Sequence, residues 1–223
     1  MQIIRGMMIP EDLAPEELKK MMESSSMSTF MTACEALRLA DTYWAYGILK
    51  QYITHSDLYR RRYVLSVIFH YPQAVELVPH LERALTSGRS FLEGTALNVI
   101  IQDRITISEE ILLTYFERNL ETIDNYHCLA LDTLARSDTN ARRVQKMFRL
   151  CRNKSTRIAL AQQLYGFCST DNHMVLYELF RNNPVPHIRI LACRIARDYH
   201  YPELLDGFSQ DPDGHIRKLS RKL

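Results

Sequence analysis

A helical pattern that returns every 28 to 34 residues constrains this chain more than any other feature of its sequence. Residues 156–164 match 187–195, and these match 215–223: each copy has a Leu, then a small residue, then an aliphatic residue three positions later. Residues 96–100 match 130–134 in the same way. This period is typical of a two-helix unit, which stacks on its neighbours because it cannot bury its apolar face alone.

The repeat predicts an all-α chain of about six two-helix units. We place them at 28–55, 57–87, 89–120, 122–153, 155–182 and 186–209, with a terminal helix at 213–223. Residues 28–223 are expected to form one domain. The chain has only 7 Gly and 8 Pro in 223 residues, which agrees with helices joined by short turns.

Polar residues that favour helix starts and turns stand at the predicted breaks. Thr54–Asp57, Ser137–Asn140 and Asp211–Gly214 are three of these breaks. Asp, Ser and Asn side chains accept hydrogen bonds from the first backbone amides of a helix, so we expect helices to begin there.

The residues Asp211-Pro212-Asp213-Gly214-His215-Ile216-Arg217 resemble the turn and first-helix start of a HEAT-like repeat, an armadillo-type fold. Residues 183–189 are a weaker copy with Asn in place of Asp. The resemblance implies a right-handed α–α superhelix, an α-solenoid. It also implies that the turn Asp and the helix Arg form hydrogen bonds between neighbouring units, a role we assign to Asp213, Arg217 and Arg189. HEAT-like arrays serve mainly as scaffolds for protein–protein interaction.

The first 27 residues differ from the repeats. Seven of the nine methionines lie within the first 31 residues, and 15–22 forms a short helix that starts at a proline. We expect this segment to cap the open end of the first repeat. The alternative is a flexible Met-rich arm that binds a partner or a membrane surface.

The sequence shows no catalytic motif of the GxSxG, HExxH or phosphate-loop type, and its eight histidines are dispersed. We therefore expect no enzyme, no cofactor and no metal site. Five scattered cysteines without a CxxC pair favour reduced, mostly buried thiols in a cytoplasmic protein. No apolar run approaches the ~18 residues that span a membrane, and we expect no signal peptide.

The net charge of +2 is unevenly distributed, because residues 1–110 sum to −3 and residues 111–223 to +5. Within the basic half, Arg142, Lys146 and Arg149 share one face of the helix over 140–153. The HEAT-like resemblance puts second helices on the concave side, so this basic stripe would line the groove and bind an acidic peptide or a phosphate backbone. The alternative is an ordinary solvated face, as we expect for Arg60–Arg62 on a first helix.

Aromatic residues suggest a second surface. Trp44 and Tyr46 crowd one predicted second helix, and with Lys50 they would form a recognition surface. Tyr115, Arg118 and Tyr177 would continue it along the array. Core packing is the alternative for these rings.

The function these features favour is a non-catalytic scaffold that holds a protein or peptide, acidic if the basic stripe is used, in a concave groove. The alternative is a nucleic-acid-binding solenoid similar to HEAT-like alkylation-repair DNA glycosylases. A cofactor-handling enzyme similar to HEAT-like bilin lyases and a purely structural subunit are further options. The oligomeric state stays open.

Overall fold

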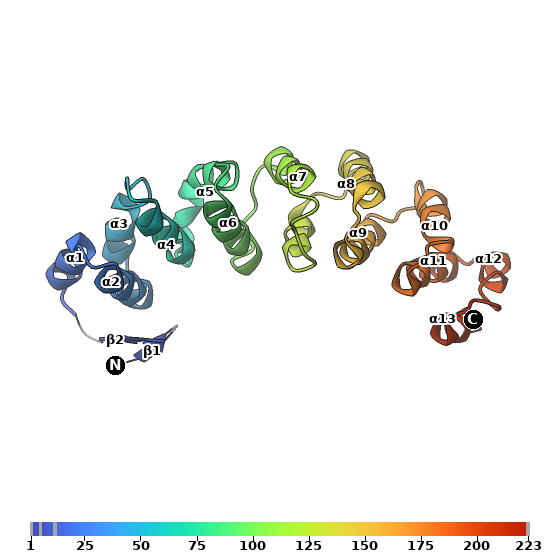
Figure 1. Ribbon diagram of the computed structural model, residues 1–223, viewed down its shortest axis with the longest axis horizontal. Helices are drawn as coiled ribbons and strands as arrows, with labels where there is room; N and C mark the ends of the chain where they lie inside the picture. Colours follow the sequence, from blue (N-terminus) through green and yellow to red (C-terminus); the bar gives the residue numbers. More distant parts are fainter. Residues whose placement is uncertain (1, 5, 11–12, 222–223) are drawn as a thin grey trace. The chain divides into compact units, whose positions relative to one another are not determined.

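The computed structural model describes residues 2–4, 6–10 and 13–221 and is all-α apart from one two-stranded hairpin (Figure 1). Its contacts divide the chain into two compact units, Met1–Ile111 (unit 1) and Leu112–Leu223 (unit 2). We describe each unit by itself. Helix α7 (Glu109–Arg118) crosses the division. The single domain over 28–223 stays a prediction.

Unit 1 begins with strands β1 (Gln2–Ile4) and β2 (Met7–Ile9). Its helices are α1 (Pro15–Glu23), α2 (Met27–Ala40), α3 (Tyr43–Gln51), α4 (Leu58–Ile68), the 3-10 helix η1 (Pro72–Leu77), α5 (Val78–Leu85) and α6 (Ser90–Gln102). Helix α2 packs on α4 and α4 packs on α6, so these three first helices of the predicted hairpins form a row. Figure 1 shows α3 and α5 on one side of that row.

The N-terminal segment docks on unit 1. Helix α1 packs on α2 and buries Leu18 and Met22, and the Met22 sulfur accepts a hydrogen bond from the Cys34 thiol at 3.6 Å. The antiparallel hairpin was not predicted. It pairs Ile3 with Met8, turns through Gly6 at φ +77°, and buries Ile9. Two strands of three residues are too short to show the alternation that identifies a strand in sequence.

Unit 2 contains the rest of α7, the 3-10 helix η2 (His127–Thr133), α8 (Asp138–Leu150), α9 (Lys154–Gly166), α10 (His173–Arg181), α11 (Pro186–Asp198), α12 (Pro202–Asp206) and α13 (Gly214–Ser220). Here η2, α9, α11 and α13 pack in succession as the first-helix row. Helices α8 and α10 pack on α9 and α11, and Figure 1 shows them on one side of that row.

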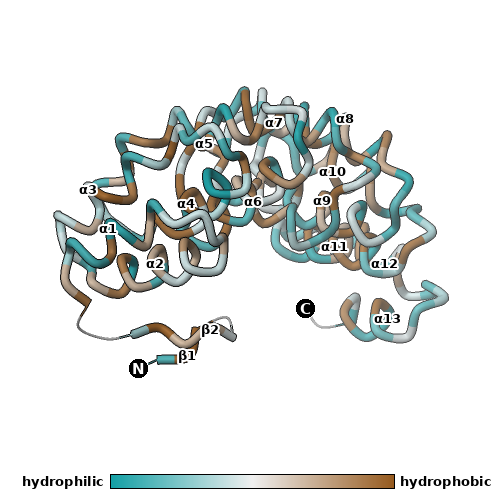
Figure 2. The backbone as a smooth tube through the Cα atoms, turned by 60° about the vertical axis from the view of Figure 1, so that its left-hand side comes forward, coloured by the Kyte–Doolittle hydropathy of each residue, from teal (hydrophilic) through white to brown (hydrophobic). Residues whose placement is uncertain are grey.

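Each helix of either unit turns an apolar face inward. Figure 2 shows apolar and polar stretches alternating along the helices, and the fully buried side chains include Phe30, Phe116, Phe148 and Phe180. Burying one such ring stabilises the folded state by about 1.5–3 kcal/mol. Several helices begin where the sequence predicted. The side chains of Asp57, Ser137 and Asp213 accept hydrogen bonds from the first amides of α4, α8 and α13.

Hydrogen bonds between successive hairpins recur at nearly constant sequence separation. Tyr63 donates to Glu35, Arg62 to Thr95, Gln163 to Asp132 and Tyr165 to Asp198, over separations of 28, 33, 31 and 33 residues. Each bond joins two neighbouring first helices. The period seen in the sequence therefore returns in the polar contacts of each unit.

All five cysteines carry free thiols, and all but Cys168 are buried. Burial raises the pKa of the Cys128 thiol to about 12 and also raises that of Cys34. These thiols stay protonated at neutral pH and are poor nucleophiles. Within the described ranges, no helix has the length and apolar character needed to cross a membrane.

Candidate peptide-binding groove

A hollow of about 450 Å³ crosses the first-helix row of unit 1. It is lined by Met27 and Met31 of α2, by Tyr59, Arg62, Tyr63 and Ser66 of α4, and by Thr95, Asn98, Val99 and Gln102 of α6. Its volume lies in the range of ~300–1,000 Å³ that is usual for ligand pockets. We call this hollow the first-helix groove.

Helical spacing explains why these side chains meet. The groove residues of α4 and of α6 stand at positions i, i+3, i+4 and i+7, which place side chains on one face of a helix. Met27 and Met31 are four residues apart on α2. Three neighbouring helices thus each contribute one stripe, and the three stripes lie side by side because α2 packs on α4 and α4 on α6.

Buried hydrogen bonds fix the three stripes relative to one another. Glu35 of α2 is fully buried, accepts from the Tyr63 hydroxyl of α4 at 2.9 Å, and binds Arg38 at 2.8 Å. Arg62 Nε donates to Thr95 Oγ1 of α6 at 3.0 Å. A buried carboxylate is stable only when it is paired, so the Arg38 and Tyr63 contacts hold Glu35 in place. These bonds join α2, α4 and α6 at the floor of the groove.

Arg62 is the charged residue that faces the groove. Its neighbours are used elsewhere: Arg60 donates to the Met22 and Ser24 carbonyls, and Arg61 donates twice to the His55 carbonyl. Of the three side-chain nitrogens of Arg62, only Nε has a hydrogen-bond partner among the described residues. The Arg62 side chain is exposed. Its two Nη groups can bind a carboxylate in the bidentate manner typical of arginine. Arg62 is exposed, as expected for a solvated face, whereas Arg60 and Arg61 are half-buried and bind backbone carbonyls.

The groove also offers amides and an aromatic wall. Asn98 and Gln102 of α6 each carry a donor and an acceptor, which suits an extended peptide backbone. Tyr59 is 63% exposed and stacks on Phe91 with ring centroids 5.5 Å apart. The Ser66 hydroxyl donates to the Tyr63 carbonyl, and that of Thr95 to the Phe91 carbonyl, so neither hydroxyl is set up as a nucleophile. The arrangement is suited to binding.

The predicted aromatic surface is mostly core. Tyr46, Tyr115 and Tyr177 are 4%, 8% and 3% exposed, as the core-packing alternative expected. The Tyr46 hydroxyl and the Lys50 ammonium both donate to Glu76 Oε1, the latter at 2.7 Å, and these bonds lower the pKa of Glu76. Both residues thereby link α3 to η1.

The remaining members of that predicted surface do not line the groove. Trp44 is 38% exposed and borders a hollow of about 370 Å³ with Leu39 and Pro10. In unit 2, the Arg118 guanidinium lies 6.0 Å from the Tyr115 ring centroid. The members of the predicted aromatic surface, like those of the basic stripe, belong to second helices: Trp44, Tyr46, Lys50, Tyr115, Arg118 and Tyr177.

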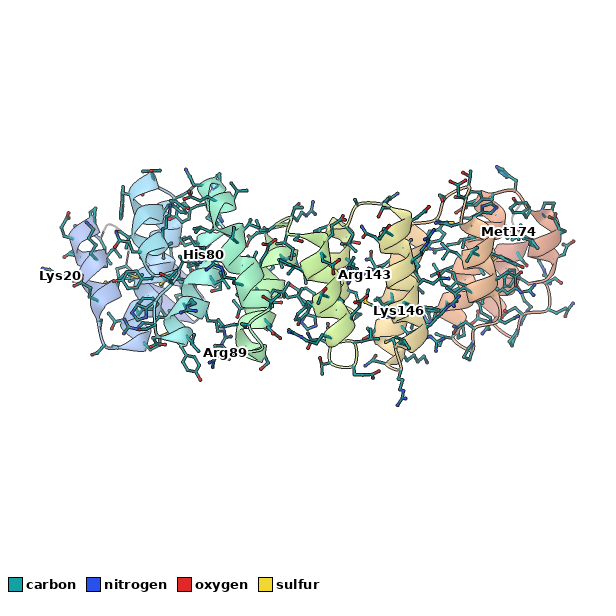
Figure 3. All side chains as sticks on the ribbon, turned by 90° about the horizontal axis from the view of Figure 1, so that it is seen from above. Lys20, His80, Arg89, Arg143, Lys146 and Met174 are labelled. Carbon is teal, nitrogen blue, oxygen red and sulfur yellow. The ribbon has the colours of Figure 1, made fainter. Side chains whose placement is uncertain are left out.

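The basic stripe exists but has acidic neighbours. Arg142, Lys146 and Arg149 are exposed on α8, while Val144, Met147 and Phe148 are buried on the opposite face. Arg142 shares a hollow of about 230 Å³ with Asp138 and Asp171. Glu117 binds Arg143 at 3.0 Å, and this bond, with a smaller contribution from Lys146, lowers the pKa of Glu117. Figure 3 labels Arg143 and Lys146 on α8. These carboxylates weaken the field that an acidic ligand would meet.

The direct packing of first helices also bears on where the stripe lies. Within unit 2, α9 packs on both η2 and α11, whereas α8 packs chiefly on α9. The more closely packed row lies on the inside of any bend of a unit. This packing favours the first helices, and not the second helices, as the inner row.

Arg189, one of the predicted inter-repeat residues, binds an aspartate, but this aspartate is Asp211 and not the predicted Asp213. Arg189 of α11 donates through Nε and Nη2 to the two carboxylate oxygens of Asp211, both at 2.8 Å, and this contact lowers the pKa of Asp211. Asp213 instead caps α13. Arg217 donates to the Asp211 and Pro212 carbonyls, so it holds the turn.

None of the residues that line the first-helix groove is among the predicted partner-binding residues. The signal was available in the spacing, since Tyr59, Arg62, Tyr63 and Ser66 already share one helical face in the sequence. Burial decides which face of a first helix stays open, and burial was not visible. In the part of the chain that the structure describes, no three His, Cys, Asp or Glu side chains gather as a metal site.

Comparison with known proteins adds no family. No protein-family model matches the chain, and no curated protein matches it. Among solved structures, an engineered protein, a target of the Northeast Structural Genomics Consortium, is similar with 15% sequence identity and a TM-score of 0.29. That match covers 92% of this chain and 93% of the other. A TM-score this low carries no argument about fold or function.

Proposed function

We propose that the chain is a non-catalytic binding scaffold, a HEAT-like solenoid of about six two-helix repeats that holds an acidic peptide segment of a protein partner. The site we propose is the first-helix groove and not the basic stripe of α8. The recurrence of hydrogen bonds between neighbouring first helices, at separations of 28 to 33 residues, supports the repeat architecture.

One observation carries the choice of ligand. Arg62 faces a groove whose lining contains no acidic side chain, and its two Nη groups are without a partner among the described residues. A carboxylate of the ligand would pair with Arg62. An apolar neighbour of that carboxylate would contact Met27 and Met31, whose flexible thioethers adapt to different shapes. Asn98 and Gln102 would bind the peptide backbone.

A displayed library of random peptides, selected on the folded chain, tests this function. The enriched peptides should carry Asp or Glu beside an apolar residue. Measured by fluorescence anisotropy, their affinity should fall about ten- to a hundredfold in Arg62→Glu, since a charged hydrogen bond contributes about 1.5–3 kcal/mol. Arg89→Glu, an exposed arginine outside the groove, should bind as the parent does.

Two results would count against the function. One is a selection that enriches no acidic peptide. The other is an equal loss of affinity in Arg62→Glu and Arg89→Glu, which would indicate general electrostatic attraction. Circular dichroism of each variant shows whether its helices are intact.

A further inference from the structure

A second hollow of unit 1, separate from the first-helix groove, collects positive charge. It has a volume of about 260 Å³ and is enclosed by the residues that follow α3, by α4 and α5, and by the start of α6. Its floor is apolar, formed by the buried side chains of Ile53, Leu65, Ala84 and Leu92. We call it the α4–α5 pocket.

Three basic side chains and two hydroxyls line this pocket. Arg61 comes from α4, His80 and Arg83 come from α5 (Figure 3 labels His80), and Thr54 and Ser87 supply the hydroxyls. His80 and Arg83 are three residues apart, which puts them on one side of α5, and Ser87 lies in the turn that follows the helix. The polar groups therefore converge from two helices on one apolar floor.

No carboxylate balances these charges within the lining. The acidic residues of the surrounding elements are engaged elsewhere: Asp57 caps α4, Glu82 accepts from the Ser108 amide at 2.7 Å, and Glu93 accepts from the Gly88 amide at 2.8 Å. Arg61 is anchored on the His55 carbonyl through Nε and Nη2, which leaves its Nη1. Among the described residues, the side chains of His80 and Arg83 have no hydrogen-bond partner.

The lowered pKa of His80 agrees with an excess of positive charge in the pocket. Burial lowers the pKa of His80 most, and the nearby Arg83 and Arg61 lower it further. Protonation of the ring would add a third positive charge beside the two guanidinium groups. An anion bound among them would remove that cost.

We propose that the α4–α5 pocket is a binding site for a phosphate monoester. A phosphate group carries up to two negative charges and three acceptor oxygens, which match Arg61, Arg83 and His80 together with the Thr54 and Ser87 hydroxyls. The apolar floor has room for the group that bears the phosphate. A small phosphate ester and a phosphorylated side chain both present this group.

Calorimetric titration of the full chain with phenyl phosphate tests the site. Binding should be saturable, and Arg83→Gln should weaken it about ten- to a hundredfold, as expected for loss of a charged hydrogen bond. Arg89→Gln is the matched control, an exposed arginine of the same unit outside the pocket, and should bind as the parent does. Inorganic phosphate and a phosphoserine peptide, titrated in parallel, separate the two sources of the ligand by their relative affinities.

The role of His80 is tested with sulfate, which keeps its charge throughout this range. Sulfate affinity should rise as pH falls below about 6.5, because the lowered pKa of His80 delays its protonation to that range, and this rise should be absent in His80→Gln. Three results would overturn the proposal: no binding of phenyl phosphate, equal losses in Arg83→Gln and Arg89→Gln, or binding of benzoate as tight as that of phenyl phosphate. None of these outcomes affects the first-helix groove.

Discussion

At the scale of single residues, the Arg189–Asp211 pair is a bidentate and well-buried ion pair of unit 2. Two hydrogen bonds of 2.8 Å join the guanidinium and the carboxylate, whose side chains are only 11% and 6% exposed. Asp211 also accepts from the Asp213 amide, and Arg189 donates to the Asn183 carbonyl. The pair therefore ties α11 to the turn before α13.

Asp211→Ala should lower the free energy of unfolding by about 3 kcal/mol, because it leaves the buried Arg189 charge without a carboxylate to pair with. Urea denaturation followed by circular dichroism measures this change. Asp206→Ala, an exposed aspartate of α12, should change stability by less than about 0.5 kcal/mol. Similar losses in the two variants would show that the Arg189–Asp211 pair contributes no more to stability than an exposed aspartate does.

Acid should remove the stabilisation that the Arg189–Asp211 pair provides. Arg189 holds the pKa of Asp211 below its usual value, so the folded state releases this proton more readily than the unfolded chain does. The stabilisation is complete above the unfolded pKa of about 3.9 and is lost as pH falls through the lower folded value. The stability difference between the parent and Asp211→Asn should therefore shrink below about pH 4. A difference that stays constant down to pH 2 would contradict this linkage.

At the scale of elements, local sequence explains the helix starts well. Ser137 shows this most simply, because its hydroxyl accepts from the Asn140 amide at 3.2 Å and α8 follows. Ser137→Ala should lower the free energy of unfolding by about 1 kcal/mol, whereas Ser137→Gly should cost only a few tenths. Thermal unfolding of the two variants separates them, and equal losses would mean that the hydroxyl is not the cause.

Helix α8 also provides a test of the basic stripe. Arg142, Lys146 and Arg149 are exposed, so their combined reversal to Glu should leave the helical signal in circular dichroism unchanged. If the first-helix groove is the binding site, the same variant should bind the selected peptides as the parent does. A large loss of affinity would restore the stripe as the binding surface.

The sequence predicted helices and their breaks better than it predicted surfaces. Periodicity identified the buried face of α8 because Val144, Met147 and Phe148 repeat with the helix. It could not tell that Tyr46 and Tyr177 are buried, since an aromatic residue on a helix has the same spacing in a core as on a surface. The β1–β2 hairpin was not predicted, because its register depends on the burial of Ile9 against the rest of unit 1 and on the positive φ of Gly6.

At the scale of the whole molecule, the division of contacts into two units has a consequence for stability. Stability in an array of repeats is approximately a sum of local terms, so damage in one place is not shared evenly. Asp211→Ala should raise amide hydrogen exchange in α11 and α13 more than in α4 and α6. Leu65→Ala, in the core of unit 1, should do the reverse. Uniform acceleration in both variants would indicate one cooperative unit.

The hydrogen bonds between neighbouring hairpins also have a mechanical consequence. Each of them closes a stretch of 28 to 33 residues and engages only the next hairpin along the chain. A chain pulled from its ends would then lose hairpins one after another and not all at once. Each loss would release roughly 100 Å of contour, since an extended residue spans about 3.3–3.6 Å. The protein would yield to force as a series of short, equal extensions.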